Sequence, residues 1–230
     1  MKLKKMTEND LSSRRLYDDA CGAAHALDLV GERWALLVMR ELFWGPKRFS
    51  DLRASLPGIS ANVLTQRLEG LEASGIVVKR KLAPPAGVQV YDLTDWGRES
   101  EPIFQALGRW ASRSPWHDTT KAFSASSLML SLRTMFDPRR VKDGGVTVGF
   151  NIAGETFLAR IGDGRIEIAH GDPAGADVVF TGPPPLIAAT IYGGQEIADL
   201  EATGALAVTG NRRLAKRFVT WFPLPAKVSV

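Results

Sequence analysis

Hydrophobic positions repeat with a helical period through much of the first hundred residues. Leu64, Leu68 and Leu71 follow i, i+4, i+7 spacing and predict a buried stripe on a helix that Ser60 caps and Gly75 ends. Gly and Pro residues end the helices before it, and two β-rich runs joined by a Pro- and Gly-containing loop follow it. The pattern predicts helices at 23–30, 34–43, 49–55 and 61–74, strands at 76–82 and 88–93, and a helix at 95–112.

The pattern changes after residue 113, where a polar stretch at 114–126 predicts a linker. Short β-rich runs separated by Gly and Asp follow, and then short helical runs, which is typical of an α+β layer. The elements expected there are a helix at 127–136, strands at 146–152, 156–161, 165–169 and 176–181, helices at 183–191 and 196–201, a strand at 205–209 and a helix at 212–222. We therefore predict an α+β protein with a polar lead-in at 1–19, a first domain at 20–113 and a second domain at 127–224.

Positive charge is concentrated in one part of the first domain. Residues 47–81 hold seven Lys or Arg and three Asp or Glu, an excess equal to the whole chain's net charge of +4. Three of these bases, Lys79, Arg80 and Lys81, lie on the first strand of the predicted hairpin, while Lys47 and Arg48 precede a short helix. Such a local excess is typical of a surface that contacts nucleic-acid phosphates.

The outward face of the 61–74 helix carries Asn62, Thr65, Gln66 and Glu69 when the leucines point inward. Asn and Gln amides pair with adenine edges, and hydroxyls contact bases or phosphates. A solvated helix face is the alternative, but the adjacent basic hairpin favours a winged helix that binds double-stranded DNA. The predicted DNA-binding residues are Lys47, Arg48, Ser60, Asn62, Thr65, Gln66, Arg67, Lys79, Arg80 and Lys81.

The segments Leu27–Arg40, Gly45–Phe49, Ile59–Gly75 and Leu93–Gly97 resemble the HxlR-type winged helix-turn-helix transcription regulators. The resemblance covers about residues 20–113 and includes a single cysteine before the first helix. It implies a homodimer on a roughly palindromic operator, assembled through the 23–30 and 95–112 helices. The partner-facing stripe would be Trp96, Ile103, Leu107 and Trp110, and packing within one subunit is the alternative for these side chains.

Cys21 is the only cysteine, so an intrachain disulfide is excluded and a reducing compartment fits best. The chain start shows no secretory signal and no stretch has the length and apolarity of a membrane span, so we expect a cytoplasmic protein without a membrane partner. Some HxlR relatives use this cysteine as a redox sensor. Because Asp18 and Asp19 would oppose a thiolate, a buried, inert Cys21 is favoured over that role.

The second domain carries no nucleophile–base pair, no metal-ligand cluster and no phosphate-binding loop, so we expect no catalytic site, metal or cofactor. Gly171–Pro173, Ala176–Phe180 and Gly204–Gly210 resemble segments of sterol-carrier-type domains, in which helices cover a sheet and leave an apolar tunnel. The resemblance implies a hydrophobic-ligand cavity, and plain core packing is the alternative for its wall residues. The candidate wall consists of Phe150, Phe157, Phe180, Ile187, Ile191, Tyr192, Leu206, Phe218 and Trp221.

These observations favour a homodimeric DNA-binding transcription regulator whose second domain binds a hydrophobic small-molecule effector or strengthens assembly. The alternative is a carrier or sensor of an apolar molecule whose first domain is a protein-interaction module. An enzyme is the least supported class.

Overall fold

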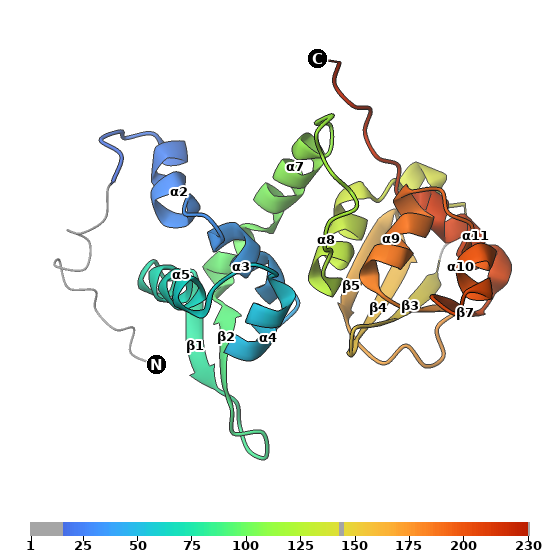
Figure 1. Cartoon of the computed structure of the whole chain (residues 1–230), viewed down its shortest axis with the longest axis horizontal. Helices are drawn as coiled ribbons and strands as arrows, with labels where there is room; N and C mark the ends of the chain where they lie inside the picture. The colour runs from blue at the N-terminus through green and yellow to red at the C-terminus, as the bar shows by residue number, and fades with distance from the viewer. Residues whose placement is uncertain (1–15, 143–144, 230) are drawn as a thin grey trace. The chain divides into compact units, whose positions relative to one another are not determined.

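The computed structural model describes residues 16–142 and 145–229. The chain divides into two compact units, Met1–Ser100 and Glu101–Val230 (Figure 1). The division falls before the 114–126 segment that the sequence predicts as a linker. The consequence is that the helix beginning at Glu101 belongs to the second unit.

The first unit contains the helices and the hairpin that the sequence predicts, with ends shifted by a few residues. Its elements are α2 (Gly22–Val30), α3 (Ala35–Leu42), α4 (Phe49–Ser55), α5 (Ala61–Ala73), β1 (Val77–Lys81), β2 (Gln89–Leu93) and α6 (Asp95–Glu99). Leu64, Leu68 and Leu71 of α5 are buried with Val38 and Leu42 of α3. The leucine stripe therefore forms the core, and the opposite face of α5 is left to solvent.

Strands β1 and β2 pair antiparallel, with Lys79 opposite Tyr91. The chain before α4 adds to this hairpin, because Lys47 and Tyr91 exchange two backbone hydrogen bonds of 3.0 and 2.9 Å. Gly75 has a φ of 71°, the left-handed conformation expected where α5 ends. The hairpin is thereby fixed to the C-terminal end of α5 and to the start of α4.

The single helix predicted at 95–112 is wrong, because the structure contains α6 (Asp95–Glu99) and α7 (Glu101–Ala111) in its place. Pro102 is the physical reason, since it has no N–H to donate to the carbonyl of Arg98 and is tolerated only in the first turn of a new helix. Thr94 caps α6 by accepting from the Gly97 N–H at 3.0 Å. Gly97 is required there, because a Cβ would lie 2.3 Å from the carbonyl oxygen of Ile76.

The second unit is an α+β layer, as the sequence predicts. Its five-stranded sheet has the order β5-β4-β3-β6-β7, with β3 and β6 parallel and the other pairs antiparallel. The strands are β3 (Val146–Ile152), β4 (Glu155–Gly162), β5 (Arg165–His170), β6 (Val178–Thr181) and β7 (Ala207–Gly210). The helices are α7, α8 (Ala125–Met135), the short η1 (Pro138–Arg140), α9 (Pro184–Tyr192), α10 (Ile197–Ala202), α11 (Arg212–Phe218) and η2 (Val219–Trp221). The further likeness to a sterol-carrier fold stays a prediction.

An aromatic cluster fills the space between this sheet and its helices. Phe218 of α11 lies 6.0 Å from Phe150, 5.7 Å from Phe180 and 4.9 Å from Phe222 between ring centroids. Trp221 packs edge-on against the same ring at 5.6 Å. All five side chains are essentially inaccessible to solvent. Four of the predicted tunnel-wall residues, namely Phe150, Phe180, Phe218 and Trp221, therefore pack against one another as core, which corrects that expectation.

No helix in the described part of the chain has the length and apolarity needed to cross a membrane.

Candidate nucleic-acid interface and the surfaces around it

Helix α5 presents a polar, uncharged surface over its first two turns. Ser60 is the N-cap, and its Oγ accepts a hydrogen bond of 3.2 Å from the Val63 N–H. Asn62, Thr65 and Gln66 are exposed, as predicted, whereas the acidic side chains of the helix lie further along, at Glu69 and Glu72. The exposed surface of polar, uncharged side chains is therefore confined to the N-terminal half of α5.

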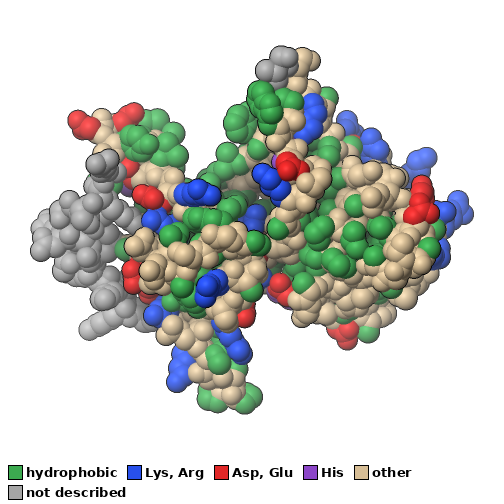
Figure 2. Space-filling model, in the orientation of Figure 1, with side chains coloured by type: hydrophobic (Ala, Val, Ile, Leu, Met, Phe, Trp, Pro, Cys, Tyr) green, Lys and Arg blue, Asp and Glu red, His purple; other side chains and the backbone are tan. Residues whose placement is uncertain are grey.

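The hairpin that follows α5 presents basic side chains on both of its faces. Side chains alternate along a strand, so Lys79 and Lys81 share one face of β1 and Arg80 occupies the other. All three are exposed, and the Lys79 ammonium lies 5.8 Å from the centroid of the Tyr91 ring. Figure 2 shows Lys and Arg side chains along the flanks of this hairpin, whose tip is apolar.

A carboxylate that the sequence analysis did not single out holds one of these bases. Asp92 of β2 is buried, and its Oδ2 accepts from Arg80 at 2.7 Å while its Oδ1 accepts from Arg98 at 2.5 Å. Arg98 also donates to the Phe43 carbonyl at 3.3 Å. This network links the hairpin to α6 and to the end of α3. The only signal in the sequence is an acidic residue between Tyr91 and Leu93 in a predicted strand.

Lys47 does not contribute to the basic surface, which corrects the prediction of a phosphate contact. Its side chain is 8% exposed, and its Nζ lies 3.6 Å from Oε2 of Glu41, which is 0% exposed. The same carboxylate accepts from Arg40 at 2.8 Å. Lys47 therefore compensates a buried charge, as buried carboxylates require. Its neighbour Arg48 is exposed, as predicted.

Arg67 forms an ion pair within the protein, and this pairing argues against the predicted contact of its guanidinium group with DNA. Its side chain is 20% exposed, and its Nη1 lies 2.9 Å from Oε2 of Glu32, in the segment between α2 and α3. Arg53, in the last turn of α4, is a further exposed base that is not among the predicted DNA contacts.

Cys21 is exposed at the N-cap of α2, which corrects the expectation of a buried thiol. The backbone N–H groups of Ala23 and Ala24 in the first turn of that helix lower the pKa of Cys21 below its ordinary value. Asp19, expected to oppose a thiolate, uses its Oδ1 to accept from the Cys21 backbone N–H at 2.8 Å.

The four residues predicted to form a partner-facing stripe are exposed within their own units. Trp96 lies on α6 of the first unit, and Ile103, Leu107 and Trp110 lie on α7 of the second, where Trp110 is 73% exposed. Helix α2 has no buried residue and exposes Leu27. Figure 2 shows hydrophobic side chains on the visible faces of α2 and α7. These four side chains are therefore not buried in the single chain, and their place in a partner surface stays a prediction.

The second unit has a cleft of about 520 Å³ on its surface, formed by α9, the start of α10, α11, η2 and the chain that follows η2. Ile191 and Tyr192 are the only predicted wall residues that line it, and it also contains charged side chains such as Lys216. The Tyr192 hydroxyl lies 2.7 Å from Oγ of Ser131, and burial raises the pKa of Tyr192. Across residues 16–142 and 145–229, no group of His, Cys, Asp and Glu side chains is arranged to hold a metal ion.

Comparison with known proteins assigns the N-terminal half of the chain, including α7. Residues 29–119 match the HxlR-like helix-turn-helix family. The HTH-type transcriptional regulator YvaP of Bacillus subtilis is 41% identical over 88 residues, which are 38% of this chain and 81% of YvaP. The regulator sll1512 of Synechocystis is 41% identical over 93 residues, covering 40% of this chain and 68% of the relative.

Solved structures match the same share of the chain. The reduced form of the transcriptional regulator YodB from B. subtilis is 32% identical, covers 44% of this chain and 99% of YodB, and has a TM-score of 0.39. The redox regulator HypR in its oxidised form is 33% identical, covers 40% of this chain and 94% of HypR, and has a TM-score of 0.37.

The helices, the basic hairpin and the relatives define the protein as a helix-turn-helix transcription regulator. More narrowly, the chain belongs to the HxlR-like helix-turn-helix family.

Proposed function

We propose that the protein is a homodimeric, DNA-binding regulator that reads a roughly palindromic operator with α5 and the β1–β2 hairpin. The single observation that carries this proposal is the exposed polar surface of Asn62, Thr65 and Gln66 on the helix that runs directly into a hairpin bearing exposed Lys79 and Lys81. Amide side chains supply base contacts and ammonium groups neutralise phosphates. Arg48 and Arg80 add further positive charge, and Ser60 keeps its O–H free to donate to a phosphate while its Oγ caps α5.

Homodimerisation is supported by the exposed apolar side chains of α2, α6 and α7. Leu27, Trp96, Ile103, Leu107 and Trp110 are all large and exposed in a single chain. Apolar side chains gathered on the outer faces of helices favour association with another surface. A dimer would present two copies of α5 to two half-sites of an operator.

The second unit is proposed to bind an effector in its surface cleft. Its volume falls within the range of small-molecule sites, and Ile191 and Tyr192 give it part of an apolar wall. Because Phe150, Phe180 and Trp221 pack against Phe218, the surface cleft is a better-supported position for an effector than a tunnel lined by these rings.

A second level of control is proposed for Cys21. The related solved structures include a quinone-bound YodB and a redox regulator HypR in oxidised and reduced forms. In this chain the exposed thiol with its lowered pKa supports a similar sensitivity to oxidants or electrophiles.

Selection of binding sites from a random duplex library by the full chain, followed by titration of the best site, tests the DNA-binding proposal. We expect an enriched sequence with two related half-sites and an affinity that falls steeply between about 50 and 200 mM salt. Recovery of no enriched sequence at low salt would contradict the proposal.

A further inference from the structure

The chain after η2 forms a strap, defined here as residues 222–229, that connects the cleft of the second unit to the end of α7. The first part of the strap lines the cleft through Phe222, Pro223 and Leu224. The next part runs alongside the residues that follow α7. The strap therefore lines the cleft and at the same time contacts the residues that follow α7.

Three hydrogen bonds join the strap to the chain after α7. The Val228 N–H donates to the Arg113 carbonyl at 2.9 Å, and Arg113 Nε donates to the Ala226 carbonyl at 3.3 Å. Lys227 Nζ donates to the Ser114 carbonyl at 2.9 Å. The Arg113 N–H in turn donates to the carbonyl of Trp110, the most exposed residue of the α7 stripe. A shift of the strap would therefore change the hydrogen bonds next to the C-terminal end of α7.

The other end of α7 is held firmly in the same unit. Arg133 of α8 forms an ion pair of 2.5 Å with Glu101 and also donates to the Ile168 carbonyl of β5 at 2.7 Å. Arg109 donates to the Thr134 carbonyl of α8. Helix α7 is thus fixed to α8 along its length, and the strap attaches where the helix ends.

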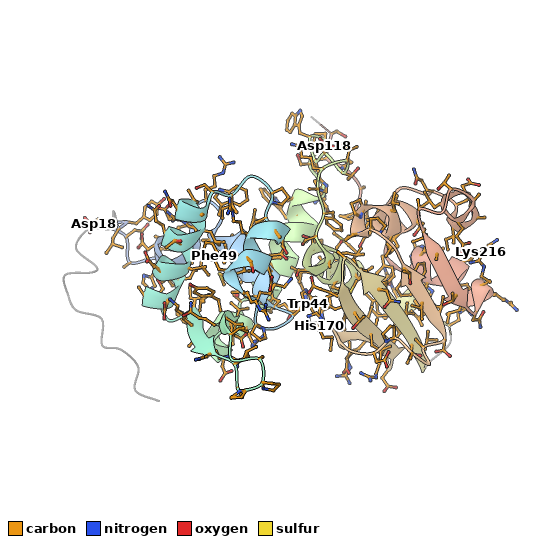
Figure 3. All side chains as sticks on the ribbon, turned by 60° about the horizontal axis from the view of Figure 1, so that its bottom comes forward. Asp18, Trp44, Phe49, Asp118, His170 and Lys216 are labelled. Atoms are coloured by element: carbon orange, nitrogen blue, oxygen red, sulfur yellow. The ribbon has the colours of Figure 1, made fainter. Side chains whose placement is uncertain are left out.

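The cleft combines an apolar wall with two cationic side chains. Ile191, Val219 and Leu224 supply the apolar part. Lys216 extends from the outer side of α11 (Figure 3) and has no ion-pair partner within the residues that the structure describes. Arg140 is held in place by donating to the Thr220 carbonyl at 3.2 Å, with Asp137 3.6 Å from its Nε. One acidic side chain, Glu196, also lines the cleft. Lys216 is the cationic side chain of the cleft that forms no ion pair among the described residues, so it is the candidate partner of an anion.

We propose that this cleft binds an amphipathic monoanion, a carboxylate with a short apolar chain, and that the strap transmits its binding to the end of α7. The carboxylate would pair with Lys216, and the apolar chain would lie against Ile191 and Leu224. Displacement of Leu224 then alters the hydrogen bonds at 113–114. The inference rests on the proposed function, because α7 carries the stripe assigned to the homodimer. A ligand regulates DNA binding only as far as it favours one arrangement of that stripe over another.

Calorimetric titration of the full chain with octanoate, and with 1-octanol as the uncharged probe, tests the binding step. We expect octanoate to bind and 1-octanol to bind at least about fivefold more weakly. Lys216→Gln should weaken octanoate by about fivefold. Arg213→Gln is the matched control, because Arg213 is exposed on the same helix and does not line the cleft. Absence of octanoate binding, or an equal loss in both variants, would overturn the proposed site.

Hydrogen exchange of residues 107–114 with and without octanoate tests the coupling step. Octanoate should change exchange there in the wild type but not in a chain that ends at Pro225, which keeps Leu224 and lacks the contacts to 113–114. Lys227→Met, which removes one of the three hydrogen bonds, should reduce the change in part. An undiminished response in the shortened chain would refute the coupling. Because these readouts need no DNA, their failure is distinct from a failure to bind an operator.

Discussion

Arg80 donates a hydrogen bond of 2.7 Å from Nη2 to Oδ2 of Asp92, on the neighbouring strand of the hairpin. The same carboxylate accepts from Arg98 at 2.5 Å, so one buried acid orients two guanidinium groups on different elements. Arg80 is thereby positioned on the hairpin and its charge is partly neutralised. The two lysines of β1 are left as the groups best able to neutralise phosphates.

Replacing the shared carboxylate should loosen the hairpin. Asp92→Asn leaves two arginines without their anion and should lower the free energy of unfolding by about 1–3 kcal/mol. Urea denaturation measures this change. Glu72→Gln is the control, because Glu72 is exposed on α5, and it should change stability by less than about 0.5 kcal/mol. Equal stability of the two variants would contradict the role assigned to Asp92.

Two lysines of the basic segment should behave in opposite ways. Lys81→Ala should weaken operator binding at all sequences and lower the slope of log affinity against log salt by about 1. Lys47→Ala should leave that slope unchanged for the folded protein and destabilise the fold by about 1–3 kcal/mol, because it uncovers Glu41. Fluorescence anisotropy across a salt series and thermal unfolding measure the two effects. If Lys47→Ala lowered the slope of log affinity against log salt, Lys47 would have to be a phosphate contact after all.

The amide at Gln66 should determine one base of the operator. Gln66→Ala is expected to relax the preference at one position in each half-site by about 1–3 kcal/mol, with the salt dependence preserved. This base preference is measured by competition binding with operators that are altered one base pair at a time. A uniform loss of affinity at every position would show that Gln66 contacts the backbone.

The stripe on α7 should control assembly. Trp110→Glu places a charge where an apolar partner surface is proposed and should shift the protein toward monomer in sedimentation velocity. Trp116→Glu is a matched control, since Trp116 is equally exposed but lies outside α7. A homodimer undisturbed by the Trp110 substitution would place the interface elsewhere.

The thiol of Cys21 should react faster than an ordinary cysteine at neutral pH. The N–H groups at the start of α2 lower its pKa, so the midpoint of its alkylation rate against pH should lie below that of the urea-unfolded chain. The lowered pKa also implies that the folded state gains stability relative to the unfolded state as pH rises through this range. Identical midpoints for folded and unfolded chains would contradict the proposed sensitivity.

Local sequence signals predicted much of this fold. The leucine spacing of α5, the Ser60 cap, the left-handed Gly75 and the strand-forming runs act over a few residues, so they can be recognised without knowing the tertiary structure. Exposure of Asn62, Thr65 and Gln66 followed from the same period. The composition alone also excludes an intrachain disulfide, because the chain has a single cysteine.

The tertiary structure alone decided which charged groups are available. Lys47 and Lys81 are both lysines of a basic segment, but only Lys47 lies against a buried carboxylate, that of Glu41 on α3. Phe150, Phe180 and Phe218 could line a tunnel or fill a core, and their ring contacts show that they fill it. Charge pairing and packing depend on how the folded chain orients its side chains and on which neighbours it brings together, and the local pattern specifies neither.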